Sequence, residues 1–268
     1  MSREPGPITR RLLAGSPPHG PLVLMYHSVV AGHGTPSWRW AVSMAHFIEQ
    51  LDLLSALGWV TINFADLHAA KTLPEKAVAI TFDDGYANNY AAFEELVRRG
   101  MRATWFVVTR DIGRMSGWVD EVPPQPMLSV EQLRNMHAKG MEIGSHTVSH
   151  CRLTRASEGV VAEELARSRR DLEQVLGEPV ISFAYPYGQH DDAAVSAARK
   201  AGYRTACTTR PGWALRDGDP LRIRRISIFA EDSVSTFARK LVFAENNVSW
   251  RRVAAYYSRR LASRLHLS

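Results

Sequence analysis

Four stretches of this chain place side chains that can do chemistry directly after apolar runs. They are His27 after LVLMY, Asp83 and Asp84 after AVAITF, His146 after MEIGS with His150 four positions later, and Tyr187 after SFAYP. Carboxylates and imidazoles are the usual side chains for moving protons and holding metal ions near neutral pH. If the apolar runs are parallel strands, their ends meet at one edge, and we expect these side chains to form one site.

The adjacent pair Asp83 and Asp84 in TFDDG can divide two roles, because neighbouring residues at a strand end point in different directions. Gly85 permits a tight exit from the strand. The alternative is that one aspartate caps a helix that begins near Tyr86. Taken alone, the motif supports both interpretations equally.

The histidines of SHTVSH, His146 and His150, are spaced i, i+4, so both rings can face one point on a tightly curled turn. Imidazole is a favoured ligand of zinc and other divalent metals. Two histidines with one aspartate would leave metal positions open, which is typical of a catalytic rather than a structural site. The alternative is one surface histidine and one capping histidine.

The segments that must position these residues alternate between strand-like and helix-like patterns. Strands are expected over 22–27, 59–64, 77–82, 103–109, 141–146, 180–188, 203–209 and 221–228, and helices over 43–58, 86–100, 129–140, 157–177 and 191–202. This alternation predicts βαβ units around a parallel sheet. About eight strands indicate an α/β fold closed, or nearly closed, into a barrel with its chemistry at the carboxyl ends.

Composition narrows the class of protein. The 268 residues are 45% hydrophobic, which suits one large domain, and the net charge of +6 lies largely at the two ends, so nucleic-acid binding is not expected. Cys151 and Cys207 form no CxxC pair, which favours a reducing compartment. Too few apolar residues separate Arg11 from Gly15 for a secretory signal, and no run nears the ~20 residues of a membrane span. A cytoplasmic location is therefore predicted.

Three motifs carry a resemblance to a known family. TFDDGYANN, SHTVSH and FAYPYG, in this order and spacing, resemble the polysaccharide deacetylases of the nodulation-protein type, carbohydrate esterase family 4. The resemblance extends over residues 22–230. It implies a distorted (β/α) barrel that removes N-acetyl groups from N-acetylhexosamine-containing glycans with the help of a divalent metal.

The resemblance also implies a role for each matching residue. Asp83 corresponds to the catalytic base, and Asp84, His146 and His150 correspond to the metal ligands. Tyr187 corresponds to the position whose backbone N–H helps to hold the oxyanion. The implied metal is Zn²⁺ first, with Co²⁺, Ni²⁺ or Mn²⁺ as alternatives.

The chain departs from the commonest family pattern at two places. Ala184 stands where an arginine often orients the base, so the partner of Asp83 is left open among Arg222, Arg224 and Arg225. In addition, the last strand, in LRIRRISIF, has no histidine to serve as the catalytic acid.

A subgroup of the family accounts for the missing acid. LMYHSV resembles the poly-N-acetylglucosamine deacetylases, in which the acid histidine follows the first strand, and FAYPYG resembles their arginine-free third motif. We therefore expect His27 to be the general acid. The alternative is a histidine that is simply satisfied in the core.

Aromatic residues near the motifs suit a sugar substrate, because the apolar faces of sugars stack on such rings. Trp38 in TPSWRW and Trp213 after TTRPG are expected to contact sugar, and Tyr185 and Pro186 of the third motif are expected to line the substrate site. Partly buried packing residues are the alternative for the tryptophans.

The chain is expected to divide into a flexible segment over 1–20, a deacetylase barrel over 21–245 and a basic amphipathic helix over 246–268. The last segment has apolar residues at helical spacing, several arginines and no acid. Packing on the barrel is the favoured interpretation. Peripheral contact with an anionic membrane at its inner face, through residues 248–265, is the alternative.

Two other functions remain open at this level. A catalytically inactive carbohydrate-binding barrel would explain the two departures from the family pattern. A non-haem iron oxygenase would also use two histidines and a carboxylate, but such enzymes are all-β and give Asp83 no role.

Overall fold

The computed structural model describes residues 4–16, 18–118 and 123–265, with side chains described as far as Ser258. Within this part of the chain, eight parallel strands form the main sheet, in the order β10-β1-β5-β6-β7-β8-β9, with β4 beside β5. The strands are β1 Leu22–Tyr26, β4 Val60–Ile62, β5 Ala77–Phe82, β6 Thr104–Val107, β7 Glu142–Ser145, β8 Ser182–Ala184, β9 Thr205–Cys207 and β10 Ile226–Ser227.

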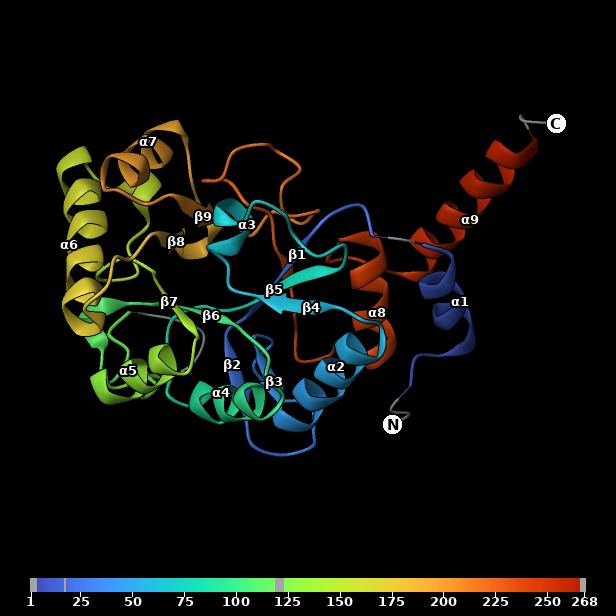
Figure 1. Ribbon diagram of the computed structural model, residues 1–268, viewed down its shortest axis with the longest axis horizontal. Helices are drawn as coiled ribbons and strands as arrows, with labels where there is room; N and C mark the ends of the chain where they lie inside the picture. Colours follow the sequence, from blue (N-terminus) through green and yellow to red (C-terminus); the bar gives the residue numbers. More distant parts are fainter. Residues whose placement is uncertain (1–3, 17, 119–122, 266–268) are drawn as a thin grey trace.

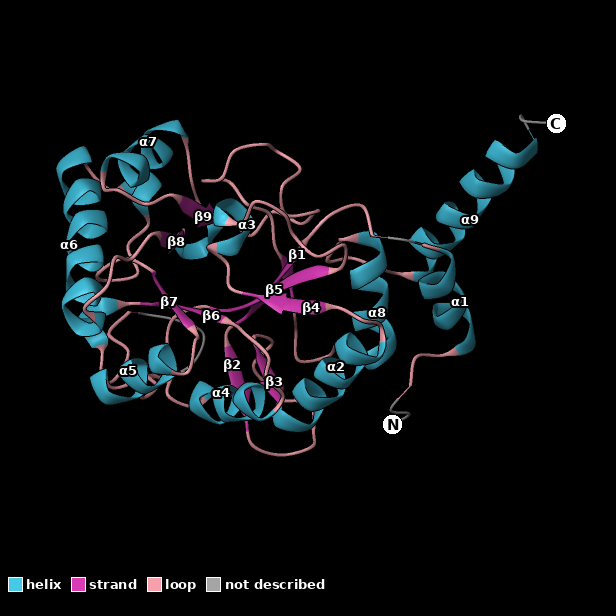
Figure 2. Cartoon of the chain, in the orientation of Figure 1, coloured by secondary structure: helices cyan, strands magenta, loops and turns pink. Residues whose placement is uncertain are grey.

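The two edges of the sheet are joined by the chain that leads into β10. Ile223 forms a parallel bridge with Cys207 of β9, and Ile226 then pairs with Leu24 of β1. The sheet is therefore curled into a distorted barrel, which confirms the predicted fold class (Figures 1 and 2).

Helices surround the curled sheet (Figure 2). They are α2 Met44–Ala56, α3 Asp66–Ala69, α4 Asn89–Arg98, α5 Val130–Ala138, α6 Glu158–Leu176, α7 Asp192–Lys200 and α8 Val234–Phe243. Their starts follow local capping chemistry: the Ser129 side chain accepts a hydrogen bond from the backbone N–H of Gln132, and the Gln132 side chain accepts one from the N–H of Ser129.

Alternation along the strands separates two apolar cores and sets the direction of the functional side chains. In β5, Val78, Ile80 and Phe82 join the core beneath the helices, whereas Ala77 and Ala79 belong to the cluster inside the barrel. Both faces are buried, as parallel sheets require. The same period of two turns Thr81 and then Asp83 inward, at the carboxyl end of the strand.

Several elements differ from the sequence-based expectation. A second, two-stranded sheet pairs β2 Ser28–Val30 with β3 Ala41–Ser43, and it was not predicted. The last strand is two residues long rather than the expected 221–228, because the chain there crosses from pairing with β9 to pairing with β1. Helix α4 begins at Asn89, three residues later than expected.

The segment over 1–20, which was predicted to be flexible, contains helix α1, Pro7–Gly15, and residues 1–3 and 17 of it lie outside the described residues. Proline at its start has the φ that a first helical turn needs. Leu12 is 1% exposed, and the backbone N–H of Gly6 donates to Ser235 Oγ on α8 at 2.9 Å. Burial against α8 therefore orders this helix.

The predicted C-terminal helix is present as α9, Trp250–Leu265, and it extends away from the barrel beside α1 (Figure 1). Its first turns are attached, since Val253 is 3% exposed and the hydroxyls of Tyr256 and Ser16 are hydrogen bonded at 2.7 Å. Among the described residues, no helix combines the length and the apolar character needed to cross a membrane.

Candidate active site

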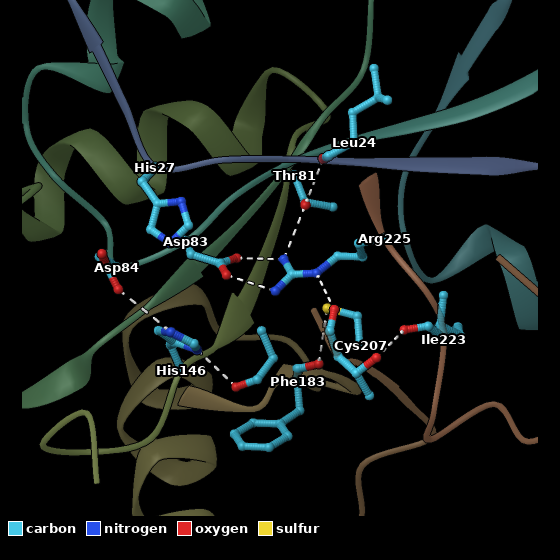
Figure 3. A network of polar contacts seen from close by, with 12 residues as sticks. Leu24, His27, Thr81, Asp83, Asp84, His146, Phe183, Cys207, Ile223 and Arg225 are labelled. Atoms are coloured by element: carbon cyan, nitrogen blue, oxygen red, sulfur yellow. Dashed lines mark hydrogen bonds and ion pairs between the residues drawn. The ribbon is translucent and has the colours of Figure 1, made fainter. Parts of the chain in front are cut away.

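The structure brings the candidate catalytic and metal-binding residues together. His27 follows β1, Asp83 and Asp84 follow β5, His146 follows β7, and Figure 3 shows their side chains converging. Because all these strands are parallel, their carboxyl ends lie on one side of the barrel. Arg225, which directly precedes β10, reaches the same place from inside the barrel.

Asp83 is held by a two-pronged ion pair with Arg225. The two terminal guanidinium nitrogens donate to the two carboxylate oxygens at 2.6 and 2.7 Å, and Nε donates to the carbonyl of Thr208 at 2.9 Å. Arg225 is 0% exposed and Asp83 is 2% exposed. Of the three arginines that the sequence left open, Arg225 is thus the partner of the aspartate.

The pair decides the charge of Asp83. Burial alone raises the pKa of this carboxyl, but the guanidinium of Arg225 outweighs burial and holds the pKa below its usual value. Asp83 is therefore ionised at neutral pH and able to accept a proton.

Asp84, His146 and His150 form a cluster that could hold a metal ion. Asp84 Oδ1 lies 3.5 Å from His146 Nε2 and 3.4 Å from His150 Nε2, and one ligand atom from each residue falls within 4.8 Å of the others. All three residues are buried. One carboxylate and two imidazoles match the donors that zinc and related divalent metals prefer.

The surroundings of the histidines fit metal binding. His146 Nδ1 lies 2.8 Å from the carbonyl oxygen of Ala184 and donates to it, which leaves Nε2 without a proton and facing the cluster. Burial lowers the pKa of both His146 and His150. Both imidazoles are therefore neutral, which is the form that binds a metal. No feature of the sequence indicated the supporting carbonyl of Ala184.

Unusual backbone conformations concentrate at this cluster. Asp84, Thr147, His150 and Tyr187 have φ between 60° and 73°, and Ala244, at the end of α8, is the one other described non-glycine residue with positive φ. Such conformations cost free energy for side chains with a Cβ and recur at functional sites. Here they turn the strand ends so that side chains from β5, β7 and β8 face one point.

Tyr187 lies beside the cluster in the short 3-10 helix Pro186–Gly188. Its ring centroid is 4.5 Å from that of His150, and the residue is 38% exposed. Gly188 follows with φ 66°, and a Cβ there would lie 2.0 Å from Thr209 Oγ1. Only glycine fits this turn, which fixes the backbone around Tyr187.

His27 lies over Asp83 on the side of the site formed by β1 (Figure 3). Its ring centroid is 4.6 Å from that of Trp40, which in turn is 5.1 Å from that of Phe229. The side chain of Asn89 donates a hydrogen bond to the carbonyl of His27 at 2.7 Å. The sequence offered only the proximity of Trp40 along the chain as a sign of this packing.

Two tryptophans lie near the cluster. Trp118 has its ring centroid 5.0 Å from that of His150 and 6.0 Å from that of Tyr86. Trp38 meets Tyr86 edge to face at 5.9 Å, so this expected sugar contact lies next to the same aromatic group.

Three expected sugar contacts are not supported by their positions. Trp213 lies at the opposite end of the barrel, because the backbone of its neighbour Ala214 bonds to Pro21 just before β1 and its ring packs on His19. Tyr185 is 0% exposed and packs on Phe183, and Pro186 is also buried. Tyr185 and Pro186 are instead buried residues that directly precede Tyr187 in its turn.

With this geometry established, known proteins place the chain in a family. The sequence profile of the polysaccharide deacetylases matches residues 70–206. The chain belongs to the polysaccharide deacetylase family. The Bacillus subtilis (strain 168) protein YxkH, whose name refers to the same family, is 30% identical over 220 residues, covering 80% of this chain and 74% of that protein.

Three other deacetylases resemble the chain in sequence or in structure. The poly-β-1,6-N-acetyl-D-glucosamine N-deacetylase of Staphylococcus epidermidis is 27% identical over 177 residues, and the match spans 62% of this chain and 59% of that protein. The structure of IcaB from Ammonifex degensii superposes with a TM-score of 0.71 at 31% identity, covering 83% of this chain and 97% of IcaB. The Streptococcus pyogenes deacetylase PplD gives a TM-score of 0.70 at 25% identity, covering 84% of this chain and 99% of PplD.

The family and the fold disfavour the other functions. An oxygenase of the all-β type does not share this parallel α/β barrel. An inactive barrel would have no need of an ionised, arginine-bound Asp83 beside an intact set of three potential ligands. The chain is a member of a hydrolase family with the residues of its first two motifs in place.

Proposed function

We propose that this protein is a metal-dependent N-deacetylase that removes acetyl groups from the N-acetylhexosamine units of a glycan. The observation that carries the proposal is the position of Asp83, which Arg225 keeps ionised next to the Asp84–His146–His150 cluster. A proton acceptor adjacent to a metal site with open positions is the arrangement that amide hydrolysis by water requires.

The residues of the chain then divide the reaction. Asp84, His146 and His150 would hold the ion, and we propose Zn²⁺, because two neutral imidazoles and a carboxylate suit it. When bound, a divalent cation there supplies Lewis acidity, which polarises a carbonyl oxygen and makes water more acidic. Asp83 takes the proton of the attacking water.

Two further residues act on the other atoms of the amide. The backbone N–H of Tyr187 donates to the oxyanion that forms, a kind of contact worth about 2.7–4 kcal/mol in other enzymes. His27 gives a proton to the departing amine, since a neutral amine leaves far more readily than an amide anion. His27 and Asp83 are far apart in the sequence, and the parallel pairing of β1 with β5 brings them together at the strand ends.

The assignment of His27 as the acid predicts a dependence on the leaving group. His27→Gln is expected to reduce acetate release from an N-acetylglucosamine oligomer by about 10²–10⁴-fold. It is expected to affect hydrolysis of 4-nitrophenyl acetate much less, because a phenolate leaves without a proton. His33→Gln is the matched control, since His33 is an exposed histidine in the loop that follows β2.

Acetate release, measured together with the metal content by elemental analysis, tests the proposed function. Protein treated with a chelator is expected to lose activity and to regain it with Zn²⁺. Absence of acetate from every N-acetylated oligomer tried, with metal bound at one equivalent, would overturn the proposal. Equal losses of His27→Gln on the amide and the phenyl ester would overturn only the role of His27.

Contact of α9 with an anionic membrane is a further proposal, and so is a cytoplasmic location at the inner face of the membrane. Its support is the basic composition of residues 246–268 and the extension of α9 away from the barrel. Flotation of the full chain with phosphatidylglycerol vesicles, compared with a chain truncated after Asn247, tests it. Equal flotation of both would leave α9 as a helix that only packs on the barrel.

A further inference from the structure

Arg152 occupies a distinctive position beside the candidate active site. It follows the proposed metal ligand His150 by two residues, and its guanidinium carbon lies 3.4 Å from the centroid of the Tyr187 ring. The Tyr187 ring also contacts that of His150, at 4.5 Å between centroids. The guanidinium is therefore held by stacking on the ring of Tyr187, the residue whose backbone N–H is proposed to hold the oxyanion.

This cation has no counter-ion within the described part of the chain. The guanidinium forms no ion pair and donates no hydrogen bond to the described residues, and its side chain is only partly exposed. Two other arginines near the strand ends are paired, Arg225 with Asp83 and Arg110 with Asp111. Arg152 differs from these two in that its guanidinium contacts an aromatic ring and no described carboxylate.

The chemistry of a stacked guanidinium indicates what it can bind. The guanidinium carbon of Arg152 lies over the aromatic ring. A guanidinium stacked in this way keeps its N–H donors, which form a rigid fork along its edge, available for a ligand. That fork matches two oxygens of a carboxylate or a phosphate, and such charge-assisted pairs are stronger than hydrogen bonds to neutral hydroxyls. Because stacking has already restricted the side chain, less conformational entropy is lost when an anion binds.

We propose that Arg152 binds an anionic group of the substrate, so that the preferred glycan carries a carboxylate or a phosphate close to the N-acetyl unit that reacts. This inference rests on the proposed function for the position of the acetamide. It makes Arg152 a determinant of specificity rather than a catalytic residue.

Three hexasaccharides of equal length separate the sources of the negative charge. The neutral one contains only N-acetylglucosamine, the second alternates N-acetylglucosamine with glucuronate, and the third is the neutral oligomer phosphorylated at C6. Values of kcat and KM for acetate release are measured with zinc-loaded wild type, Arg152→Met and Arg155→Met. Arg155 is the matched control, because it is exposed, has the same charge and lies three residues away without a ring contact.

The expected result is a preference in kcat/KM for one of the charged oligomers over the neutral one, by at least about tenfold. Arg152→Met is expected to remove most of that preference, mainly through KM, whereas Arg155→Met keeps it. The charged oligomer that is preferred identifies carboxylate or phosphate as the group bound.

Equal kcat/KM on all three oligomers in wild type would overturn the inference. So would a loss in Arg152→Met that falls on kcat alike for every oligomer, because Arg152 would then act only by holding Tyr187.

A binding measurement separates failure of this inference from failure of the proposed function. Calorimetric titration of the three oligomers into Asp83→Asn protein reports affinity without turnover. Tighter binding of a charged oligomer that depends on Arg152 supports the inference even if no acetate is ever released, an outcome that would overturn only the proposed deacetylation. Acetate release with no dependence on substrate charge would leave the deacetylase proposal standing and overturn the role of Arg152.

Discussion

Two buried ion pairs near β10 show how differently one interaction can be used. Asp83 pairs with Arg225 at the candidate active site, and Asp232 pairs with Lys240 between α8 and the loop that precedes it. All four side chains are at most 3% exposed. Arg225 makes two parallel contacts with its carboxylate, whereas a single ammonium of Lys240 is shared between Asp232 and the carbonyl of Ser227.

The outcome for the charge of the two aspartates is opposite. Burial raises the pKa of Asp232 and lowers that of Lys240, and their mutual attraction does not fully offset it. At Asp83 the fork of Arg225 outweighs burial, so the pKa falls. A bidentate arginine therefore keeps a buried carboxylate ionised, as a general base requires, whereas the single contact of a lysine leaves the pKa of its buried partner raised.

The largest expected effect is that of Asp83→Asn, which removes the proton acceptor but keeps a side chain of equal size beside Arg225. Acetate release is expected to fall by about 10²–10⁴-fold, while the metal content stays near that of wild type. Elemental analysis and initial rates on the same samples measure both. The matched variant Asp232→Asn is expected to lower stability but to keep kcat within about threefold, because Asp232 lies outside the site. Near-normal turnover by Asp83→Asn would contradict the assignment of the base.

The sequence was sufficient to predict the barrel and the convergence of the strand ends. Apolar runs such as LVLMY and AVAITF are buried on both faces, and their spacing required helical crossovers. Asp83, Asp84, His146 and His150 could be placed because each directly follows, or lies within five residues of, such a run. For these residues, the apolar pattern that predicts each strand also predicts the position of the functional side chain at its carboxyl end.

What the sequence could not predict depends on contacts between distant residues. Arg222, Arg224 and Arg225 stand within four residues in LRIRRISI, and only the crossing of the chain from β9 to β1 turns Arg225 into the barrel while Arg222 and Arg224 pair with surface aspartates. Trp213 was misplaced because a loop after β9 returns to the start of β1. Neither path of the chain produces a periodic pattern of apolar residues from which it could have been predicted.

Lys240→Met tests the structural pair and comes next in size. It leaves Asp232 buried without its cation, so the free energy of unfolding is expected to drop by about 3–5 kcal/mol. Urea unfolding followed by circular dichroism measures the change. Activity per folded molecule is expected to change little, since the ammonium contacts no proposed catalytic group. A decrease of less than about 1 kcal/mol in the free energy of unfolding would show that the pair contributes little to the stability of the fold.

A smaller effect is expected from Arg225→Lys, which keeps the charge beside Asp83 but loses the fork. The carbonyl of Thr208 loses its donor, which is expected to lower stability by about 1–3 kcal/mol. The pKa of Asp83 is expected to rise, because the guanidinium no longer lowers it. The base works only when ionised, so activity should then be lost at a higher pH on the acid side of the profile. The pH dependence of kcat/KM measures this shift, and an unchanged acid limb would show that Arg225 does not set the charge of the base.

The smallest expected effect comes from neutralising the structural pair altogether with Asp232→Asn and Lys240→Met in one chain. Replacing both charges removes the desolvation cost together with the attraction, so stability is expected to recover to within about 1–2 kcal/mol of wild type.

The dependence of stability on pH should also become weaker in the double variant. Because the pKa of Asp232 is raised by folding, wild type loses stability as the pH rises from the ordinary value of about 4 through the raised one. The double variant has no carboxyl at that position and should lack this fall. Urea unfolding at a series of pH values compares the two, and a double variant that is as unstable as Lys240→Met alone would show that the cost lies in lost packing rather than in the unpaired carboxylate.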